Sequence, residues 1–219
     1  PIKDFAPISL LALIPNVLVV HPSLAAENVQ QLIDLLKDNP GRYHYASAGN
    51  GTPSHLSAEL FKSMAGVDMI HVPYKGAGPA LIDVMGGHVP IMFDNLPPTL
   101  EHIQAGTLRA LAVTGAQPSA VLPGVPTFAQ AGYDKVDFGA WFALFAPKGT
   151  PTAILDKLQA ESAAALREPQ AARTLDGAGF VVVGSTRQAL QDLLDSEAKR
   201  WGEIVKATGF KADAGKGGS

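Results

Sequence analysis

Three short loops of the 219-residue chain carry residue types from which an anion site can be built. Residues 47–52 (SAGNGT), 74–78 (YKGAG) and 94–98 (DNLPP) each follow an apolar, strand-like stretch and precede a helix-like stretch. The N-terminus of a helix has main-chain N–H groups without intrahelical partners and the positive end of the helix dipole. Three such ends at one place would attract negative charge.

Glycines and hydroxyl groups strengthen this interpretation of the loops. The glycines that would let a bound group approach the main chain without meeting a Cβ atom are Gly49, Gly51, Gly76 and Gly78. Ser47, Thr52 and Ser54 offer hydroxyl donors. For any single loop, ordinary turn and helix-cap chemistry explains the same residues. Three loops in equivalent positions favour a binding site.

Three side chains in these loops each have two interpretations. Lys75 could form a Schiff base or hold a carboxylate, or it is a solvated surface lysine. Asp94, at the end of an apolar strand, could contact a ligand or cap the following helix. Tyr74 either lines the cleft or packs against its neighbours.

The usual catalytic patterns are missing. Ser54 and His55 are adjacent, which on a helix points them about 100° apart, and no Gly-x-Ser-x-Gly motif occurs. The six histidines lack the spacing that places two metal ligands on one helix face. Both glycine loops lack the third glycine of the dinucleotide fingerprint, and the phosphate-loop pattern fails too. We therefore expect binding without chemistry, no metal and no cofactor, and we assign His55 to helix packing.

Composition limits the possible partners. The chain is 47% hydrophobic and 17% charged, with a net charge of −3 and no run of basic residues, so nucleic acid is not an expected partner. There is no cysteine, which excludes disulfides and thiolate metal sites. The apolar run at residues 10–20 is shorter than the roughly 20 residues needed to cross a bilayer. Because Pro15 and Asn16 divide it, we interpret it as two buried strands.

Strand and helix patterns alternate along the chain. Strands are expected at residues 16–22, 42–47, 67–74, 89–94, 108–115, 136–151 and 180–185, and helices at 23–41 with Ser23 as cap, 52–66, 78–87, 97–106, 152–169 and 186–209. Residues 116–133 are expected to form a proline-rich connection with a short helix. Such alternation predicts an α/β fold with a largely parallel sheet covered on both faces. The long apolar strand around Trp141 suits a segment that crosses between two lobes.

The stretch from YASAGNGTPSHL through VPYKGAGPALIDVMGG and IMFDNLPP, continuing with LPGVPTFAQAGY and WFALFAPKGTP, closely resembles the tripartite tricarboxylate transporter substrate-binding proteins, the Bug family. The resemblance runs from about Pro1 to Gly209. It implies a periplasmic solute-binding receptor of the type II two-lobed fold. Such a receptor closes on a small carboxylate or dicarboxylate and delivers it to a membrane permease. The resemblance places the first two loops on the ligand side of the second lobe, and Asp94 matches a pocket-side aspartate.

The residues that chemistry and resemblance together assign to the ligand are Ser47, Ala48, Gly49, Asn50, Gly51, Thr52, Ser54, Tyr74, Lys75, Gly76, Ala77 and Asp94. The resemblance further implies that residues 22–140 form a complete second lobe, and that 1–21 and 141–219 form part of the first. The opening strand–helix units of the first lobe have no counterpart in this sequence. A sheet without its central strands would expose apolar edges, so self-association is expected. Two alternatives remain: a remnant or interaction module that no longer binds, and an enzyme using Lys75.

Overall fold

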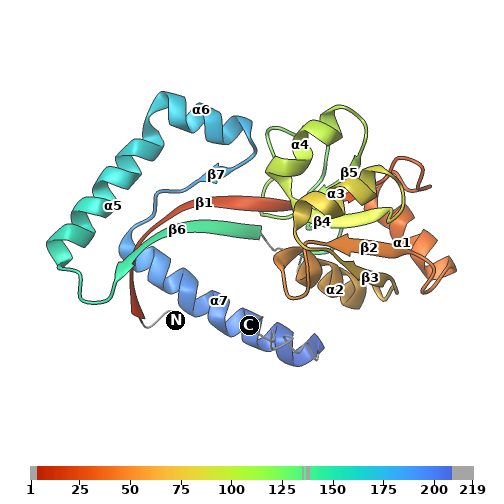
Figure 1. Cartoon of the computed structure of the whole chain (residues 1–219), viewed down its shortest axis with the longest axis horizontal. Coiled ribbons are helices and arrows are strands. Elements are labelled where there is room, and N and C mark those ends of the chain that lie inside the picture. The colour runs from red at the N-terminus through yellow and green to blue at the C-terminus, as the bar shows by residue number, and fades with distance from the viewer. Residues whose placement is uncertain (1–3, 135, 137–138, 209–219) are drawn as a thin grey trace.

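A computed structural model of the chain describes residues 4–134, 136 and 139–208. The elements are β1 (Phe5–Val20), α1 (Val29–Asp38), β2 (His44–Ser47), α2 (Pro53–Ala65), β3 (Ile70–Pro73), α3 (Ala77–Met85), β4 (Ile91–Asn95), α4 (Leu96–Gln104), β5 (Arg109–Val113), β6 (Gly139–Pro147), α5 (Thr152–Arg167), α6 (Pro169–Gly177), β7 (Val181–Val182) and α7 (Arg187–Thr208). Figure 1 shows them gathered into two bodies joined by the long strands β1 and β6. The α/β class and the two-lobed architecture are confirmed.

The first strand corrects one expectation. Residues 5–20 form one continuous strand, not two strands divided at Pro15 and Asn16. Pro15 is the last residue of β1 that pairs with β6, and Asn16 is the first that pairs with β4. Because proline lacks an N–H group, it is tolerated where one ladder of hydrogen bonds ends and another begins. The dipeptide therefore marks the point where one strand passes from the first sheet region to the second.

The larger body is built on the strand order β3-β2-β4-β1-β5. β2 runs parallel to both β3 and β4, while β1 runs antiparallel to β4 and β5. The parallel pairing predicted from the helix-linked strands is thus present, and β1 is the antiparallel exception because it enters from the other body. Buried residues of α1 and α2, such as Leu32 and Phe61, cover one face, and those of α3 and α4, such as Val84 and Leu100, cover the other.

Two local predictions need correction. The first helix begins at Val29, not after Ser23, because Asn28 is its N-cap and accepts a hydrogen bond from the Gln31 N–H at 2.9 Å. Residues 116–133 contain no helix. They form turns and bends, and Thr127 pairs with Val113 of β5 in an isolated parallel bridge.

The smaller body consists of the first part of β1 with β6, β7 and helices α5, α6 and α7. Its buried clusters are small, one around Ile8 and Leu155 and another around Leu10 and Leu190. It also carries most of the exposed large apolar side chains, namely Phe5, Leu13, Phe142, Ile154, Leu158, Val181 and Val183. This body buries little of its apolar surface within the described residues. The exposure fits the expectation of bare apolar edges.

The pairings of β1 bear on where the lobes divide. Residues 16–20 hydrogen-bond with β4 and β5, in the sheet that also holds β2 and β3. The predicted division is a second lobe at 22–140 and a first lobe from 1–21 and 141–219. We propose this division with one change: the first boundary lies within β1, between Pro15 and Asn16, instead of after residue 21.

Candidate functional site

The three glycine- and proline-rich loops lie at one edge of the larger sheet. β3, β2 and β4 are neighbouring parallel strands, so their carboxyl ends and the loops that follow share this edge. In open α/β sheets, ligands bind at such an edge. Helices α2, α3 and α4 all begin there (Figure 1). The structure therefore brings together the three helix starts that the sequence singled out.

The first two loops contact each other through the main chain. The Tyr74 N–H donates to the Ser47 carbonyl and the Gly76 N–H to the Ala48 carbonyl, each at 3.0 Å. Gly49 has a φ of 134°, and a Cβ atom built there would lie 3.1 Å from the Tyr74 carbonyl oxygen. Glycine at position 49 is thus required by both its backbone conformation and the close approach of the second loop.

The hydroxyl groups of the first loop have a different role from the expected one. The Ser47 hydroxyl lies 3.2 Å from both the N–H and the carbonyl of Gly49, and the Thr52 hydroxyl donates to the Gly49 carbonyl at 2.7 Å. Ser54 accepts from the Ala48 N–H at 3.0 Å. Ser47 and Ser54 are buried. These hydroxyl groups hold the loop in shape and use the Ala48 and Gly49 N–H groups to do so. The main-chain donors for a ligand are therefore those of the following helix start, which has no side-chain cap hydrogen bond.

The second loop places Tyr74 and Lys75 in different environments. Lys75 is exposed, the environment of a solvated lysine rather than of one activated by burial. The Tyr74 hydroxyl donates to Asp83 at 2.5 Å. Burial and this carboxylate raise the pKa of Tyr74 to about 12. Tyr74 is thus neutral and fixed against α3, at the rim of the loop pair.

Asp94 is buried at the end of β4 and does not cap the next helix, whose N-cap is Asn95. One of its oxygens, Oδ1, accepts from the Asn95 N–H at 2.8 Å, whereas Oδ2 is buried without a hydrogen-bond partner. Burial raises the pKa of Asp94 to about 6. A buried polar atom without a partner costs free energy unless a ligand or water satisfies it. The geometry thus favours the ligand interpretation of Asp94 over the cap.

Two asparagines beside Asp94 were not predicted. Asn16 and Asn95 are direct partners across β1 and β4, and the Oδ1 atom of each is buried without a partner. The Asn16 side chain donates to the Ser57 hydroxyl at 3.2 Å. The sequence signal was an asparagine inside an apolar run, which indicates a polar site when the residue is buried.

A column of aromatic rings lies behind the first loop. Tyr45, His71 and His55 come from β2, β3 and α2, and adjacent rings stack with centroids 4.9 Å and 3.9 Å apart. The His55 ring is buried, which agrees with the helix-packing assignment. It also accepts from the Gly51 N–H at 3.1 Å. Spacing could not reveal this cluster, since its three rings come from separate elements.

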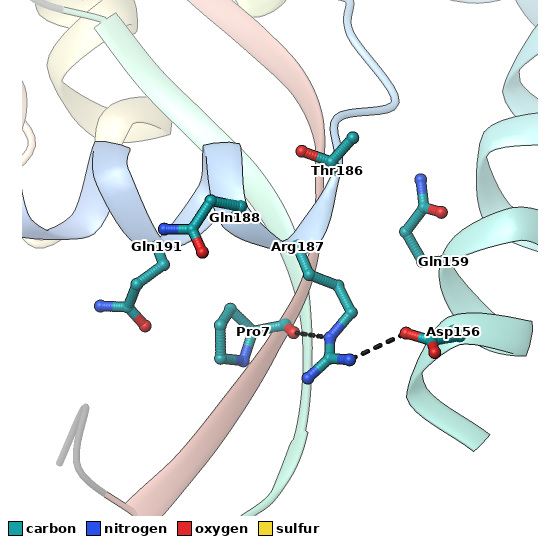
Figure 2. A pocket seen from close by; sticks show the side chains of 7 residues that line it. All are labelled: Pro7, Asp156, Gln159, Thr186, Arg187, Gln188 and Gln191. Atoms are coloured by element: carbon teal, nitrogen blue, oxygen red, sulfur yellow. Dashed lines mark hydrogen bonds and ion pairs between the residues drawn. The ribbon is translucent and has the colours of Figure 1, made fainter. Parts of the chain in front are cut away.

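A separate cavity of about 590 Å³ lies in the smaller body, lined by Pro7, Asp156, Gln159, Thr186, Arg187, Gln188 and Gln191. Figure 2 shows Arg187 pointing between the Pro7 carbonyl and Asp156. Its guanidinium donates to Pro7 at 3.3 Å and to Asp156 at 2.8 Å. Asp156 already balances the positive charge of Arg187 in this cavity.

Two kinds of feature are absent from the described residues. Among them, no group of three or more His, Cys, Asp or Glu side chains is arranged to hold a metal ion. Within the same residues, no helix has the length and apolar character of a membrane span.

Comparison with known proteins identifies the family. Residues 1–210 match the tripartite tricarboxylate transporter family receptor model, so the chain belongs to this family, a family of receptors rather than enzymes. The chain is 36% identical over 210 residues to the protein BugT of Bordetella pertussis, covering 96% of this chain and 64% of BugT. It therefore spans a little under two thirds of the length of that relative.

Solved structures agree with the fold. The chain superimposes with a TM-score of 0.86 on R. palustris Rpa4515 with adipate, at 37% identity, over 94% of this chain and 69% of the other. With MatC (Rpa3494) from Rhodopseudomonas palustris with bound malate, the TM-score is 0.81 at 29% identity, over 92% and 69% of the two chains. The chain spans 69% of the length of each of these two solved chains.

Proposed function

We propose that this chain contributes the ligand-loop lobe of a periplasmic receptor. The receptor binds a small carboxylate or dicarboxylate and delivers it to a tripartite tricarboxylate-type permease in the membrane. The observation that carries the proposal is the meeting of three helix N-termini at one sheet edge, with the first two loops hydrogen-bonded to each other. Fixed main-chain N–H groups replace the hydration shell of a carboxylate without reorganising.

The candidate residues divide into two roles. The first turns of α2, α3 and α4, whose N-caps make no side-chain hydrogen bond, present main-chain N–H groups to the anion. Residues 48–51 and 74–77 position these turns, while Ser47, Thr52 and Ser54 fix the conformation of the first loop. Asp94, with an unpartnered oxygen, faces the part of the ligand that can donate a hydrogen bond, such as a hydroxyl or a protonated carboxyl group. The relatives solved with adipate and malate support a dicarboxylate ligand.

The binding test is a thermal-shift and calorimetry panel of mono-, di- and tricarboxylates, including adipate and malate. A ligand at 100 times its dissociation constant stabilises the native state by about 2.7 kcal/mol, which is easily measured. Gly76→Ala is the site variant, because Gly76 has a φ of 109° and open space around its Cβ position. Gly66→Ala is the matched control, since Gly66 also has a positive φ and open space but ends α2 far from the loops.

We expect Gly76→Ala to lose more stability than Gly66→Ala, because Gly76 has a φ of 109° and a ψ of 170°, whereas Gly66 is in the left-handed helical region. Only Gly76→Ala should lose carboxylate affinity in the folded protein. Stabilisation by no acid at all would instead support the alternative of a non-binding remnant or interaction module. That alternative has one observation in its favour, the exposed apolar side chains of the smaller body. The same side chains support self-association, which we propose as a property of this chain in isolation.

A further inference from the structure

Two imidazole rings stack directly behind the first ligand loop. His55 is the third residue of α2 and His71 lies in β3, yet their ring centroids are 3.9 Å apart with an angle of 10° between the planes. Tyr45 of β2 continues the stack on the other side of His71. Three separate elements therefore fix the orientation of both imidazoles.

Each imidazole contacts a different end of the loop. His71 Nε2 lies 2.6 Å from the Ser47 hydroxyl oxygen, at the start of the loop. His55 Nδ1 accepts from the Gly51 N–H at 3.1 Å, near the end. Between these contacts the loop contains Ala48 and Gly49, which both approach the second loop closely.

We infer that His55 and His71 are positioning residues for ligand binding: the stacked pair holds the loop at residues 47–51 in the conformation that pairs with the second loop and sets the uncapped start of α2 at the ligand edge. The inference rests on the proposed function for the identity of the ligand. The loop geometry itself is independent of that identity.

The Ser47–His71 contact resembles a nucleophile and its base, but it does not fit that role. Ser47 is fully buried, so its hydroxyl is inaccessible to a substrate. Burial also lowers the pKa of His71 to about 4, which makes the ring a poor base near pH 7. A short hydrogen bond to a fully buried hydroxyl group that substrate cannot reach serves to fix structure.

Burial keeps the imidazole pair neutral at pH 7. Burial is the main cause of the lowered pKa of both His55 and His71. Glu59 and Lys62 of α2 shift the pKa of each imidazole in opposite directions, Glu59 upward and Lys62 downward. Their charged atoms lie 3.1 Å apart. From β2, the Tyr45 hydroxyl donates to Glu59 at 2.6 Å. The neutral state is required because His55 Nδ1 accepts a hydrogen bond only when unprotonated.

The test uses paired variants that separate the ring from its hydrogen-bonding atom. His55→Phe keeps a stacking ring without an acceptor, whereas His55→Asn places an oxygen close to the Nδ1 position. Likewise, His71→Phe keeps the ring and His71→Gln restores an acceptor close to Nε2. His88→Phe is the control, because its side chain is 75% exposed. The measurements are calorimetric affinity for adipate and malate at pH 7, and amide hydrogen exchange of Gly49 and Gly51 without ligand.

We expect each Phe variant at positions 55 and 71 to weaken binding about tenfold, as for one lost hydrogen bond, and to speed exchange of the loop amides. The Asn and Gln variants should stay within about threefold of the wild type, as should His88→Phe. Unchanged loop exchange in His55→Phe, or equal losses in His55→Phe and His55→Asn, would overturn the inference.

Two further results distinguish failure of this inference from a variant that does not fold and from failure of the proposed function. Nitrogen-detected spectra of the wild type at pH 7 should show His55 Nδ1 unprotonated, and a protonated Nδ1 would refute the assignment without any variant. Should the wild type bind no acid, the proposed function fails, while loop exchange in the same variants still decides whether the imidazoles hold the loop.

Discussion

The main-chain N–H of Gly76 donates to the carbonyl of Ala48 at 3.0 Å, which joins the second ligand loop to the first. Together with the Tyr74–Ser47 hydrogen bond, it makes two loops from separate β/α units into one surface. A carboxylate approaching this edge therefore meets two helix starts held at a fixed separation. Preorganised donors of this kind bind an anion without an ordering cost at the moment of binding.

Gly49→Ala should destabilise the protein by roughly 1–3 kcal/mol, because an added methyl group combines a strained φ with a close contact. The Cβ atom would lie 3.1 Å from the Tyr74 carbonyl oxygen, and φ is 134°. Urea unfolding measures the change. Gly66→Ala is the control for backbone strain alone, since nothing lies within 4 Å of its Cβ position. A smaller loss in Gly49→Ala than in Gly66→Ala would contradict the close-packed loop pair.

Asp94→Asn should stabilise the protein above pH 6. The folded-state pKa of Asp94 is raised from 3.8 to about 6, so the folded protein holds a proton that the unfolded chain has released. Stability from this group therefore falls as pH rises from about 4 to about 6, and it stays low above that range. The variant should gain roughly 1–3 kcal/mol at pH 8 and little at pH 4 in urea unfolding. An equal change at both pH values would exclude an ionised, unpartnered Asp94.

His71→Gln should flatten the acid side of the stability profile. The pKa of His71 is lowered from 6.5 to about 4, so the unfolded chain takes up a proton before the folded protein as pH falls. This group therefore contributes stability above pH 6.5 that is lost between about pH 6.5 and 4, by roughly 1 kcal/mol after discounting for the partly exposed ring. Its slope opposes that of Asp94, so the two variants should tilt the profile in opposite directions. Parallel profiles for the variant and the wild type would show that His71 does not titrate as described.

Ile154→Gln should weaken self-association of the isolated chain. Ile154 is 50% exposed on α5 of the smaller body, where most of the exposed apolar side chains lie. Sedimentation velocity over a range of concentrations measures the effect. Ile82→Gln is the matched control, because Ile82 is 66% exposed but lies on α3 of the larger body. A wild type that stays monomeric at every concentration would remove the basis for this prediction.

Local patterns in the sequence were sufficient for most helices, for the β/α order and for the three loops. The spacing of Thr52, Pro53 and Gly66 predicted α2 with its start and end, since caps act through neighbouring atoms. The first strand was misread because Pro15 and Asn16 look like a break. Only the partners across the sheet show that the strand continues and changes neighbours there.

The sequence alone determined that three helix starts rich in glycine and proline follow three apolar strands, because those features depend on residues a few positions apart. The tertiary structure decided that the hydroxyl groups of the first loop are used in hydrogen bonds within that loop, and that His55 and His71 contact it. Ser47 and His71 are 24 residues apart, and Asn16 and Asn95 lie on different strands, so only sheet register and helix packing could bring them together. Such contacts depend on the whole chain being folded, and no short stretch of sequence specifies them.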